Sequence, residues 1–329
     1  MDGRHRVGAL VELPQVLRDL GADPDKLIAA AGIDPRVFRN PENALTFVEL
    51  GTLLEVCVSA TGCKHLGLLV GQRSATDSLG VIGRLMQNSM TLGDAILALC
   101  THQERYERGA VVYLFVQDAI AFFGYAVHLP QIRALEQISD GAIALGFNIM
   151  KELVGLSPRE ILTSRLAPMD ITPYRRFFGF TPRFDAEQNA LLFPEKLLTM
   201  PISGANPKLR MILENLVARY WAAKRLSVAE RVVRIICPRL FFADASLETV
   251  ASVLSMHPRT LNRRLEAEGT TFRRLLGQAR FEMARQLLVG TNIQITNIAL
   301  ALGYGDTSSF SHAFQRWSGV APSQWRANI

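Results

Sequence analysis

The chain has 329 residues, of which 49% are hydrophobic, so it is long enough for two or three domains with buried cores. Its 36 Lys and Arg against 30 Asp and Glu give a formal net charge of +6, and its four cysteines show no paired short spacing. This spacing argues against a disulfide framework or a zinc knuckle and favours a reducing cytoplasm. No apolar run approaches about eighteen residues and the first residues lack a signal-peptide pattern, so we expect a cytoplasmic protein without a membrane span.

The first hundred residues are predicted to be helical. Apolar residues recur with helical spacing in five segments, which are 13–20, 24–31, 47–60, 65–72 and 79–88. Thr91 then resembles an N-cap, with Asp94 three residues later, for a further helix.

The period changes near residue 110. Ala110 to Val116 and Ile120 to Val127 are rich in Val, Tyr, Phe and Ile, which predicts a β-hairpin. A helix from about 130 to 154 is expected next, followed by strands at 160–166 and 190–193. Helices followed by strands with long connections predict an α+β sensor or dimerisation domain over residues 1–203, rather than a parallel nucleotide-binding sheet.

A linker helix is expected over residues 204–225, because Pro201, Gly204 and Pro207 punctuate the chain before a helical segment at 208–224. Its apolar residues recur at alternating four- and three-residue steps, at Leu209, Leu213, Leu216 and Tyr220. Such a seam suits a second copy of the chain in a homodimer, or packing against the first domain.

The last hundred residues contain one helix-turn-helix pattern twice. A small residue, Ala251 or Ala299, lets two helices cross closely, and four positions later Ser255 or Gly303 stands where the backbone must turn. The segment 271–288 is predicted to form one helix between the copies. At about 1.5 Å per residue it spans about 27 Å, which suits two reading helices about one DNA turn apart.

The net positive charge of the chain comes from residues 204–329. Residues 1–203 hold 19 basic and 22 acidic side chains, whereas residues 204–329 hold 17 and 8. From Leu226 onward every basic residue is arginine, which suits bidentate contacts to guanine and phosphate. The distribution favours a double-stranded DNA partner for the second half.

Residues from about Leu226 to Arg326 resemble the DNA-binding domain of the AraC/XylS family of bacterial transcription regulators. The motifs that carry this resemblance are Pro258-Arg259-Thr260-Leu261-Asn262-Arg263-Arg264-Leu265, Ile298-Ala299, Leu302-Gly303-Tyr304, Ser309-Phe310-Ser311-His312-Ala313-Phe314-Gln315-Arg316-Trp317 and Gly319-Val320-Ala321-Pro322. One departure is His312, where the family usually has arginine. The resemblance implies an all-α domain over residues 226–329 with two helix-turn-helix units, and activation by recruitment of RNA polymerase.

Residues 1–203 resemble the longer amino-terminal domain of the subgroup that includes the ornithine-utilisation regulator. The segments that carry this similarity are Leu66-Gly67-Leu68, Leu79-Gly80, Thr91-Leu92-Gly93-Asp94-Ala95, Phe177-Phe178-Gly179-Phe180 and Phe184-Asp185-Ala186. The resemblance implies a domain that senses a small molecule or mediates dimerisation.

The family's docking pattern directs Arg259, Asn262 and Arg263 into the groove, where arginine reads guanine and asparagine reads adenine. Arg264 is either a phosphate contact or a solvated side chain. Short or singly donating side chains in the second reading helix are expected to discriminate weakly, with Arg316 nearer the backbone. These side chains are Thr307, Ser308, Ser309 and His312. The aromatic residues Phe310, Phe314 and Trp317 are assigned to the core.

For an effector, aromatic residues of the predicted hairpin are candidate pocket residues, although ordinary sheet core is the alternative; they are Tyr113, Phe115, Phe122, Phe123 and Tyr125. A ligand-free oligomerisation module is the alternative for the whole first domain. Cys100, His102 and Glu104 lack the spacing of a metal site, and no phosphate loop is present, so no cofactor is expected. An enzyme with a DNA-binding appendage is the alternative of another class, but no nucleophile, base and orienting residue can be assembled.

Overall fold

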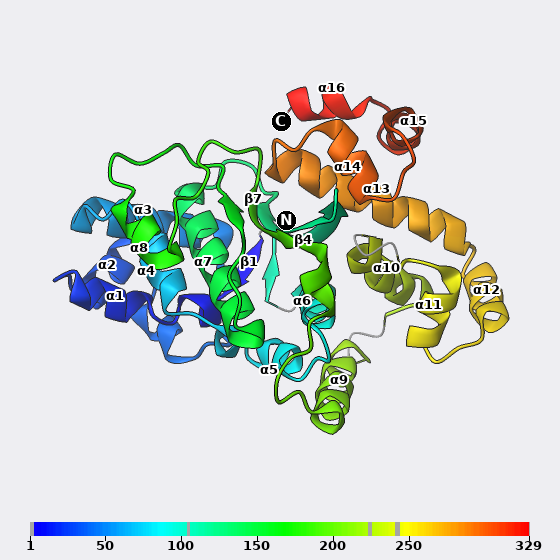
Figure 1. Ribbon diagram of the computed structural model, residues 1–329, viewed down its shortest axis with the longest axis horizontal. Helices are drawn as coiled ribbons and strands as arrows, with labels where there is room; N and C mark the ends of the chain where they lie inside the picture. Colours follow the sequence, from blue (N-terminus) through cyan, green and yellow to red (C-terminus); the bar gives the residue numbers. More distant parts are fainter. Residues whose placement is uncertain (1–2, 104–105, 223–225, 241–243, 329) are drawn as a thin grey trace.

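The computed structural model describes residues 3–103, 106–222, 226–240 and 244–328. Figure 1 shows a mixed helix-and-sheet region followed by an all-helical region that lies against it. This order confirms the expected α+β domain followed by an all-α domain with two helix-turn-helix units joined by a long helix.

Helices dominate the first hundred residues, as predicted. They are α1 (Leu13–Asp19), α2 (Pro24–Ala30), α3 (Phe47–Thr61), α4 (Leu66–Gln72), α5 (Val81–Gln87) and α6 (Leu92–His102), with 3-10 turns η1 (Val7–Leu10), η2 (Pro35–Arg39) and η3 (Thr76–Leu79). Thr91 caps α6 as expected, since its side chain accepts a hydrogen bond from the backbone N–H of Asp94.

The first domain also contains two antiparallel sheets. One has the order β2-β1-β3, from β1 (Arg4–Arg6), β2 (Ala44–Thr46) and β3 (Glu107–Arg108); the other has the order β4-β5-β7-β6, from β4 (Ala110–Gln117), β5 (Ile120–Val127), β6 (Glu160–Leu162) and β7 (Asn189–Pro194). The hairpin β4–β5 closes tightly because Asp118 and Ala119 both adopt positive φ.

One long helix, α7 (Leu135–Val154), covers the inner face of the larger sheet and packs on β5 and β7. It starts five residues later than predicted, because Gln131 and Ala134 have positive φ and cannot extend the helix. The short helix α8 (Thr172–Phe178), the turn η5 (Glu195–Thr199) and the small first sheet are not anticipated by the sequence pattern.

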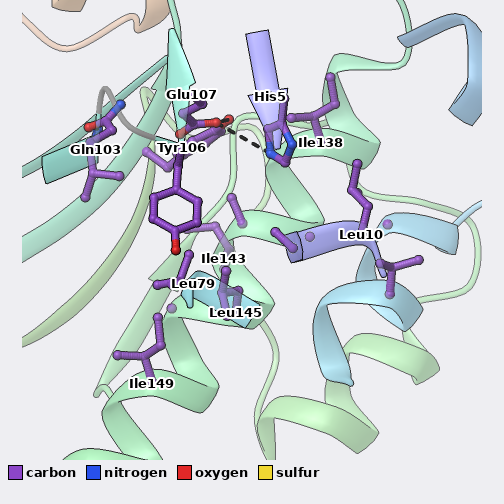
Figure 2. A pocket seen from close by; sticks show the side chains of 18 of the residues that line it. His5, Leu10, Leu79, Gln103, Tyr106, Glu107, Ile138, Ile143, Leu145 and Ile149 are labelled. Atoms are coloured by element: carbon purple, nitrogen blue, oxygen red, sulfur yellow. Dashed lines mark hydrogen bonds and ion pairs between the residues drawn. The ribbon is translucent and has the colours of Figure 1, made fainter. Parts of the chain in front are cut away.

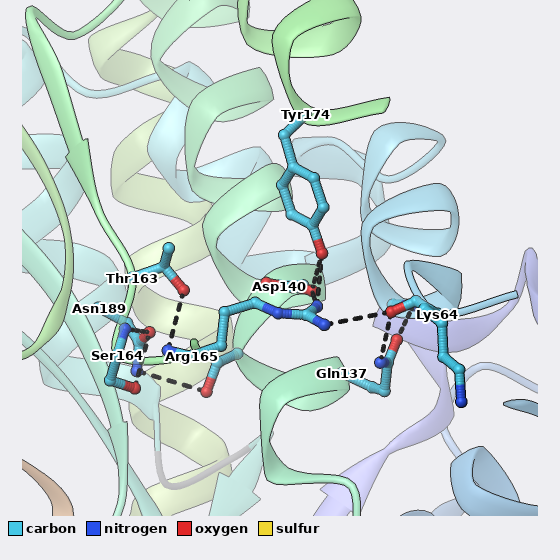
Figure 3. A network of polar contacts seen from close by, with 10 residues as sticks. Lys64, Gln137, Asp140, Thr163, Ser164, Arg165, Tyr174 and Asn189 are labelled. Atoms are coloured by element: carbon cyan, nitrogen blue, oxygen red, sulfur yellow. Dashed lines mark hydrogen bonds and ion pairs between the residues drawn. The ribbon is translucent and has the colours of Figure 1, made fainter. Parts of the chain in front are cut away.

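A buried polar network fixes α7 to its surroundings (Figure 3). The carboxylate of Asp140 on α7 pairs with Arg165 and accepts a hydrogen bond of 2.6 Å from the hydroxyl of Tyr174 on α8. Arg165 also donates to the carbonyl of Lys64, before α4. Burial raises the pKa of Asp140 to about 6, although Arg165 and Tyr174 oppose the rise. Since every member bonds another, the network is a structural clamp.

From Pro207 onward, the described residues form helices joined by turns and loops. These helices are α9 (Pro207–Ala222), α10 (Val228–Arg239), α11 (Leu247–Val253), α12 (Pro258–Ala267), α13 (Phe272–Gly290), α14 (Ile295–Ala301), α15 (Thr307–Ser318) and α16 (Pro322–Ala327). Helix α13 runs between the unit formed by α11 and α12 and the unit formed by α14 and α15 (Figure 1).

The linker helix α9 packs on the first domain. Leu213 is buried with Leu85 and Ala98, whereas Leu216 at the next step of the expected seam is 52% exposed. No single helix in the described ranges is long and apolar enough to cross a membrane; α3 and α4 pass such a test only as a pair bent by 108°.

Candidate nucleic-acid interface and internal cavity

The first helix-turn-helix unit consists of α11, a tight turn and α12. The turn closes with a hydrogen bond of 2.8 Å from the N–H of Met256 to the carbonyl of Ala251. Ser255, where the sequence pattern predicts a sharp turn, adopts φ +54°, which is the left-handed conformation. Leu261 and Leu265 are fully buried, so the opposite face of α12 points outward.

The second unit, α14 and α15, repeats this geometry. The N–H of Tyr304 donates to the carbonyl of Ala299 at 3.0 Å, and Gly303 at the turn has φ +75°. The guanidinium of Arg280 on α13 lies 4.8 Å from the centre of the Tyr304 ring and donates to the carbonyl of Gly303. The turn of the second unit is therefore held directly by α13.

The exposed face of α12 carries three arginines. Arg259, Arg263 and Arg264 are exposed and Asn262 is half-buried. Within the described ranges none of the three guanidinium groups forms an ion pair. Their charge is thus available to phosphates and base edges.

The corresponding face of α15 is less charged. Ser308, His312 and Arg316 are exposed, and Thr307 is half-buried with its hydroxyl donating to Thr296. The hydroxyl of Ser309 donates to Asp306, the residue that caps α15. Two of the four short side chains expected to read bases are therefore already engaged within the protein.

The aromatic stripe of α15 is only partly core. Phe310 and Phe314 are buried as expected, whereas Trp317 is 42% exposed and stacks on Phe281 of α13 with one face. The prediction that Trp317 belongs to the core is therefore corrected. Its ring covers the side of α13, because the small residue Gly277 leaves room for it.

The position of α12 depends on a residue that the sequence pattern does not single out. Glu268, which follows α12, accepts hydrogen bonds of 2.9 and 2.8 Å from the N–H groups of Val228 and Ala229. These N–H groups belong to the first turn of α10 and lack helical partners. The carboxylate thereby ties the end of α12 to the start of α10.

A cavity of about 110 Å³ lies inside the first domain (Figure 2). Its walls come from β1, η1, the helices α3, α4, α6 and α7, and the inner face of the larger sheet. Most of the lining is apolar, including Leu10, Leu79, Ile138, Ile143 and Ile149. Apolar cavities of about 150 Å³ hold a molecule the size of benzene. The cavity therefore suits a compact ligand.

One corner of the cavity is polar. The hydroxyl of Tyr125 donates to Glu107 Oε2 at 3.0 Å, and Nε2 of His5 lies 3.5 Å from the same oxygen. Burial raises the pKa of Glu107 to about 7, with Tyr125 opposing the rise, and burial lowers the pKa of His5 to about 4. At neutral pH His5 is therefore uncharged and does not neutralise the carboxylate.

The hairpin aromatic residues are divided between two environments. Phe123 and Tyr125 line the cavity. Tyr113, Phe115 and Phe122 lie on the outer face of the hairpin, in the hydrophobic cluster shared with the second domain, where Phe115 and Phe122 stack at 4.7 Å. Successive side chains of a strand point to opposite faces, so no single pocket can take all five residues.

The outer face of the hairpin packs against the helical second half of the chain. Helix α13 packs on β4 and β5, and Val111, Tyr113 and Phe115 share one core with α10, α13 and α14. At the end of α13 the backbone of Gly290 approaches so closely that a Cβ atom would lie 2.8 Å from the carbonyl oxygen of Val127. One hairpin thus separates the cavity from the reading unit.

The potential metal ligands that lie close together in the sequence are Cys100, His102 and Glu104. Cys100 is half-buried, and burial raises the pKa of its thiol to about 12; Glu104 lies outside the described residues. Within the described ranges no group of three His, Cys, Asp or Glu side chains is placed to hold a metal ion.

Two family models match the sequence. The model described as the arabinose-binding domain of AraC transcription regulators, N-terminal, matches residues 21–202, and a helix-turn-helix domain model matches residues 250–328. The first match includes most of the cavity, and the second includes both reading helices.

Relatives are similar over nearly the whole chain. The ornithine utilization regulator of Pseudomonas aeruginosa is 28% identical over 321 residues, which cover 95% of this chain and 94% of that protein. The transcriptional regulator VirS of Mycobacterium tuberculosis is 27% identical over 318 residues, which cover 95% and 93%. The crystal structure of the transcriptional regulator CdpR from Pseudomonas aeruginosa covers 92% of this chain and 96% of that chain, with 25% identity and a TM-score of 0.47.

Proposed function

The chain belongs to the AraC family of transcription regulators, and from this premise we propose that it reads two successive major grooves of DNA through α12 and α15. The observation that carries the proposal is the repeated geometry: both units close with the same turn hydrogen bond and leave one helix face exposed. Helix α13, of 19 residues, is about 28 Å long, which suits readers about one DNA turn apart.

The two helices are proposed to contribute differently. Arg259, Asn262 and Arg263 of α12 read bases, and Arg264 contacts phosphate. In α15, Ser308 and His312 give weak base discrimination, since Thr307 and Ser309 have partners within the protein. Arg316 lies nearer the backbone of the DNA.

Substitution of single arginines tests this division. Binding sites are first selected from a random DNA pool with the full chain, and affinity is then measured by fluorescence anisotropy. Arg263→Ala should lose about 1–3 kcal/mol on the selected site and flatten discrimination at one base position. Arg316→Ala should weaken binding to all sequences alike.

Arg39→Ala, which removes an exposed arginine of the first domain, serves as the control and should leave affinity unchanged. Equal, sequence-independent losses from Arg263→Ala and Arg316→Ala would refute base reading by Arg263.

We also propose that a small-molecule effector in the cavity alters DNA binding through the hairpin β4–β5. The support is structural continuity: Phe123 and Tyr125 face the cavity, and Tyr113 and Phe115 of the same hairpin pack with the reading unit. The proposed output is activation by recruitment of RNA polymerase, in a bacterial cytoplasm. Transcription in vitro from a promoter with the selected site distinguishes activation from repression.

We further propose that the chain forms a homodimer. The alternative to an effector-binding first domain is a domain that serves only for oligomerisation and binds no ligand. Helix α9 leaves Met211, Ile212 and Leu216 exposed, although Leu213 is used within the chain. Sedimentation at several concentrations tests dimerisation, and binding of any metabolite to the cavity contradicts the ligand-free alternative.

We also propose that the chain divides into a first domain of residues 1–203, a linker helix at 204–225 and a DNA-binding domain of residues 226–329. The support is the change from a mixed helix-and-sheet region to an all-helical region. The relatives are transcriptional regulators, so we propose a regulatory rather than an enzymatic role for the whole chain.

A further inference from the structure

The polar groups on the cavity wall differ in whether they already have partners. The side-chain amide of Gln137 accepts from the N–H of Gly67 and donates to the carbonyl of Lys64. The amide of Gln103 accepts from the N–H of Val112 at 2.6 Å and donates to the carbonyl of Ala110. Both amides are therefore committed to holding the walls together, and a ligand gains little from them.

Glu107 is different. Its residue is 8% exposed, and the hydrogen bond from Tyr125 and the approach of His5 both end on Oε2. Among the described residues Oε1 receives no hydrogen bond. A buried carboxylate without a cation is costly, because its charge has lost water without gaining a partner. The carboxylate thus lacks one cationic or donating group.

Besides His5 and Glu107, the charged side chain that lines the cavity among the described residues is Arg6. Arg6 pairs with Glu42, and its guanidinium lies 4.7 Å from the centre of the Tyr106 ring. Among the described residues, an anionic ligand would therefore meet a carboxylate at this corner and an arginine whose charge is already paired with Glu42. A cationic ligand would supply the charge that Glu107 lacks.

We propose that the cavity binds a compact, mainly apolar primary amine, with its ammonium group on Glu107 and its hydrocarbon part against Leu79, Ile143 and Ile149. This assignment rests on the proposed effector function, because it gives the chemical class of the effector. The cavity volume of about 110 Å³ limits the ligand to about six non-hydrogen atoms unless side chains move. The ammonium would donate to Oε1, and Tyr125 would keep its bond to Oε2.

Three probes of matched length test the class: n-pentylamine, n-pentanol and pentanoate. Each is titrated into the full chain by isothermal calorimetry at pH 7.5, and melting temperature is followed in parallel. Pentylamine should bind at least tenfold more tightly than pentanol, because only the amine forms a charge-assisted hydrogen bond with Glu107. Pentanoate should not bind.

Variants locate the interaction. Glu107→Gln should abolish the preference for the amine over the alcohol while retaining pentanol binding, since the apolar walls are intact. Glu55→Gln removes a surface carboxylate and should leave the preference unchanged. If Glu107→Gln fails to fold, the order of the three probes on the unaltered chain still decides the proposal.

Binding of pentanoate as tight as that of pentylamine, binding of none of the probes, or an unchanged amine preference in Glu107→Gln would each overturn the assignment. DNA affinity is measured separately with and without pentylamine. Amine binding without a change in DNA affinity leaves the ligand class standing and contradicts the effector function. Conversely, a different molecule that alters DNA binding leaves the effector function standing and rejects the amine.

Discussion

At the scale of single residues, the two copies of the helix-turn-helix unit solve the same turn with different amino acids. Gly303 takes φ +75° without a steric penalty, but Ser255 takes φ +54° with a Cβ atom present. The left-handed conformation costs a non-glycine residue about 1–2 kcal/mol, and glycine costs about 0.5–1 kcal/mol in lost chain entropy. Steric strain therefore exceeds the entropy cost at this position.

Ser255→Gly is predicted to raise the free energy of unfolding by about 0.5–1 kcal/mol, as measured by urea denaturation. Gly303→Ala should lower it by about 1 kcal/mol or more, because the added Cβ is strained and lies 3.3 Å from Arg280 Nη2. Destabilisation by Ser255→Gly would contradict strain at the first turn.

The buried pair in the cavity gives opposite pH dependences. The folded protein keeps a proton on Glu107 up to about pH 7, whereas the unfolded chain releases it near 4.5, so this residue makes stability fall as pH rises between those values. His5 has its pKa lowered from 6.5 to about 4, so it makes stability rise with pH over that range. The two effects partly cancel.

Glu107→Gln should expose the contribution of Glu107, while Arg6, His5 and Tyr125 remain in place. The stability of the variant relative to the unaltered chain should increase from pH 4.5 to pH 7 and then stay constant, by about 1–3 kcal/mol in all. Urea denaturation at half-unit pH steps measures this difference. A difference that is flat from pH 4.5 to 8 would show that Glu107 titrates normally.

Among the helices, α12 is held by its neighbours in the orientation that the proposed reading of DNA requires. Leu261 and Leu265 bury one face, and Glu268 ties its end to the first turn of α10. If Glu268 acts only through its charge, its loss should change DNA affinity in one direction; if it positions α12, its loss should change affinity in the other direction. Removing a negative charge near DNA strengthens binding, whereas releasing α12 weakens it.

Glu268→Ala is predicted to weaken DNA binding about tenfold on all sequences and to lower the melting temperature, because the N–H groups of Val228 and Ala229 lose their acceptor. Glu266→Ala, on the same helix but exposed beside Arg263, is the matched control. It should leave stability unchanged and keep or increase affinity. Stronger binding by both variants would refute the positioning role.

In the molecule as a whole, the sheet β4-β5-β7-β6 has a packing partner on each of its two faces. Its inner face closes the cavity and its outer face shares a core with the DNA-binding half, so the two halves are in direct contact. Gly290 lies at a close approach between them, and any side chain there would press on the backbone of β5. This contact is the route along which the proposed effector would act.

Gly290→Leu should separate the two halves while leaving each helix intact. Leucine favours a helix over glycine by about 1 kcal/mol, so stabilisation is expected if the close contact is unimportant. We expect the opposite: two melting transitions in calorimetry, the earlier one below that of the unaltered chain. Gln278→Leu places the same side chain at an exposed position of α13 and should melt like the unaltered chain. A single, unshifted transition for Gly290→Leu would contradict tight coupling.

Features that depend on neighbours along the chain could be predicted from the amino-acid sequence alone. The repeated turn, the cap of α6, the hairpin β4–β5 and the helix between the two units follow from residues a few positions apart, and all are present. The surplus of arginine after Leu226 placed the DNA-binding half by charge alone. The family resemblance added the roles of individual residues on α12 and α15, which stay predictions until DNA binding is measured.

Contacts between residues of distant segments became apparent only in the folded structure. His5 and Glu107 are about a hundred positions apart, and no local pattern marks either as part of a cavity; their proximity comes from the pairing of β1 with β3. The side chains of β4 and β5 alternate between two faces of the sheet, but the strand sequences do not show which face lines the cavity. The packing of α7 on one face and of α13 on the other settles this, because burial of apolar area depends on partners that the strand's own sequence does not contain.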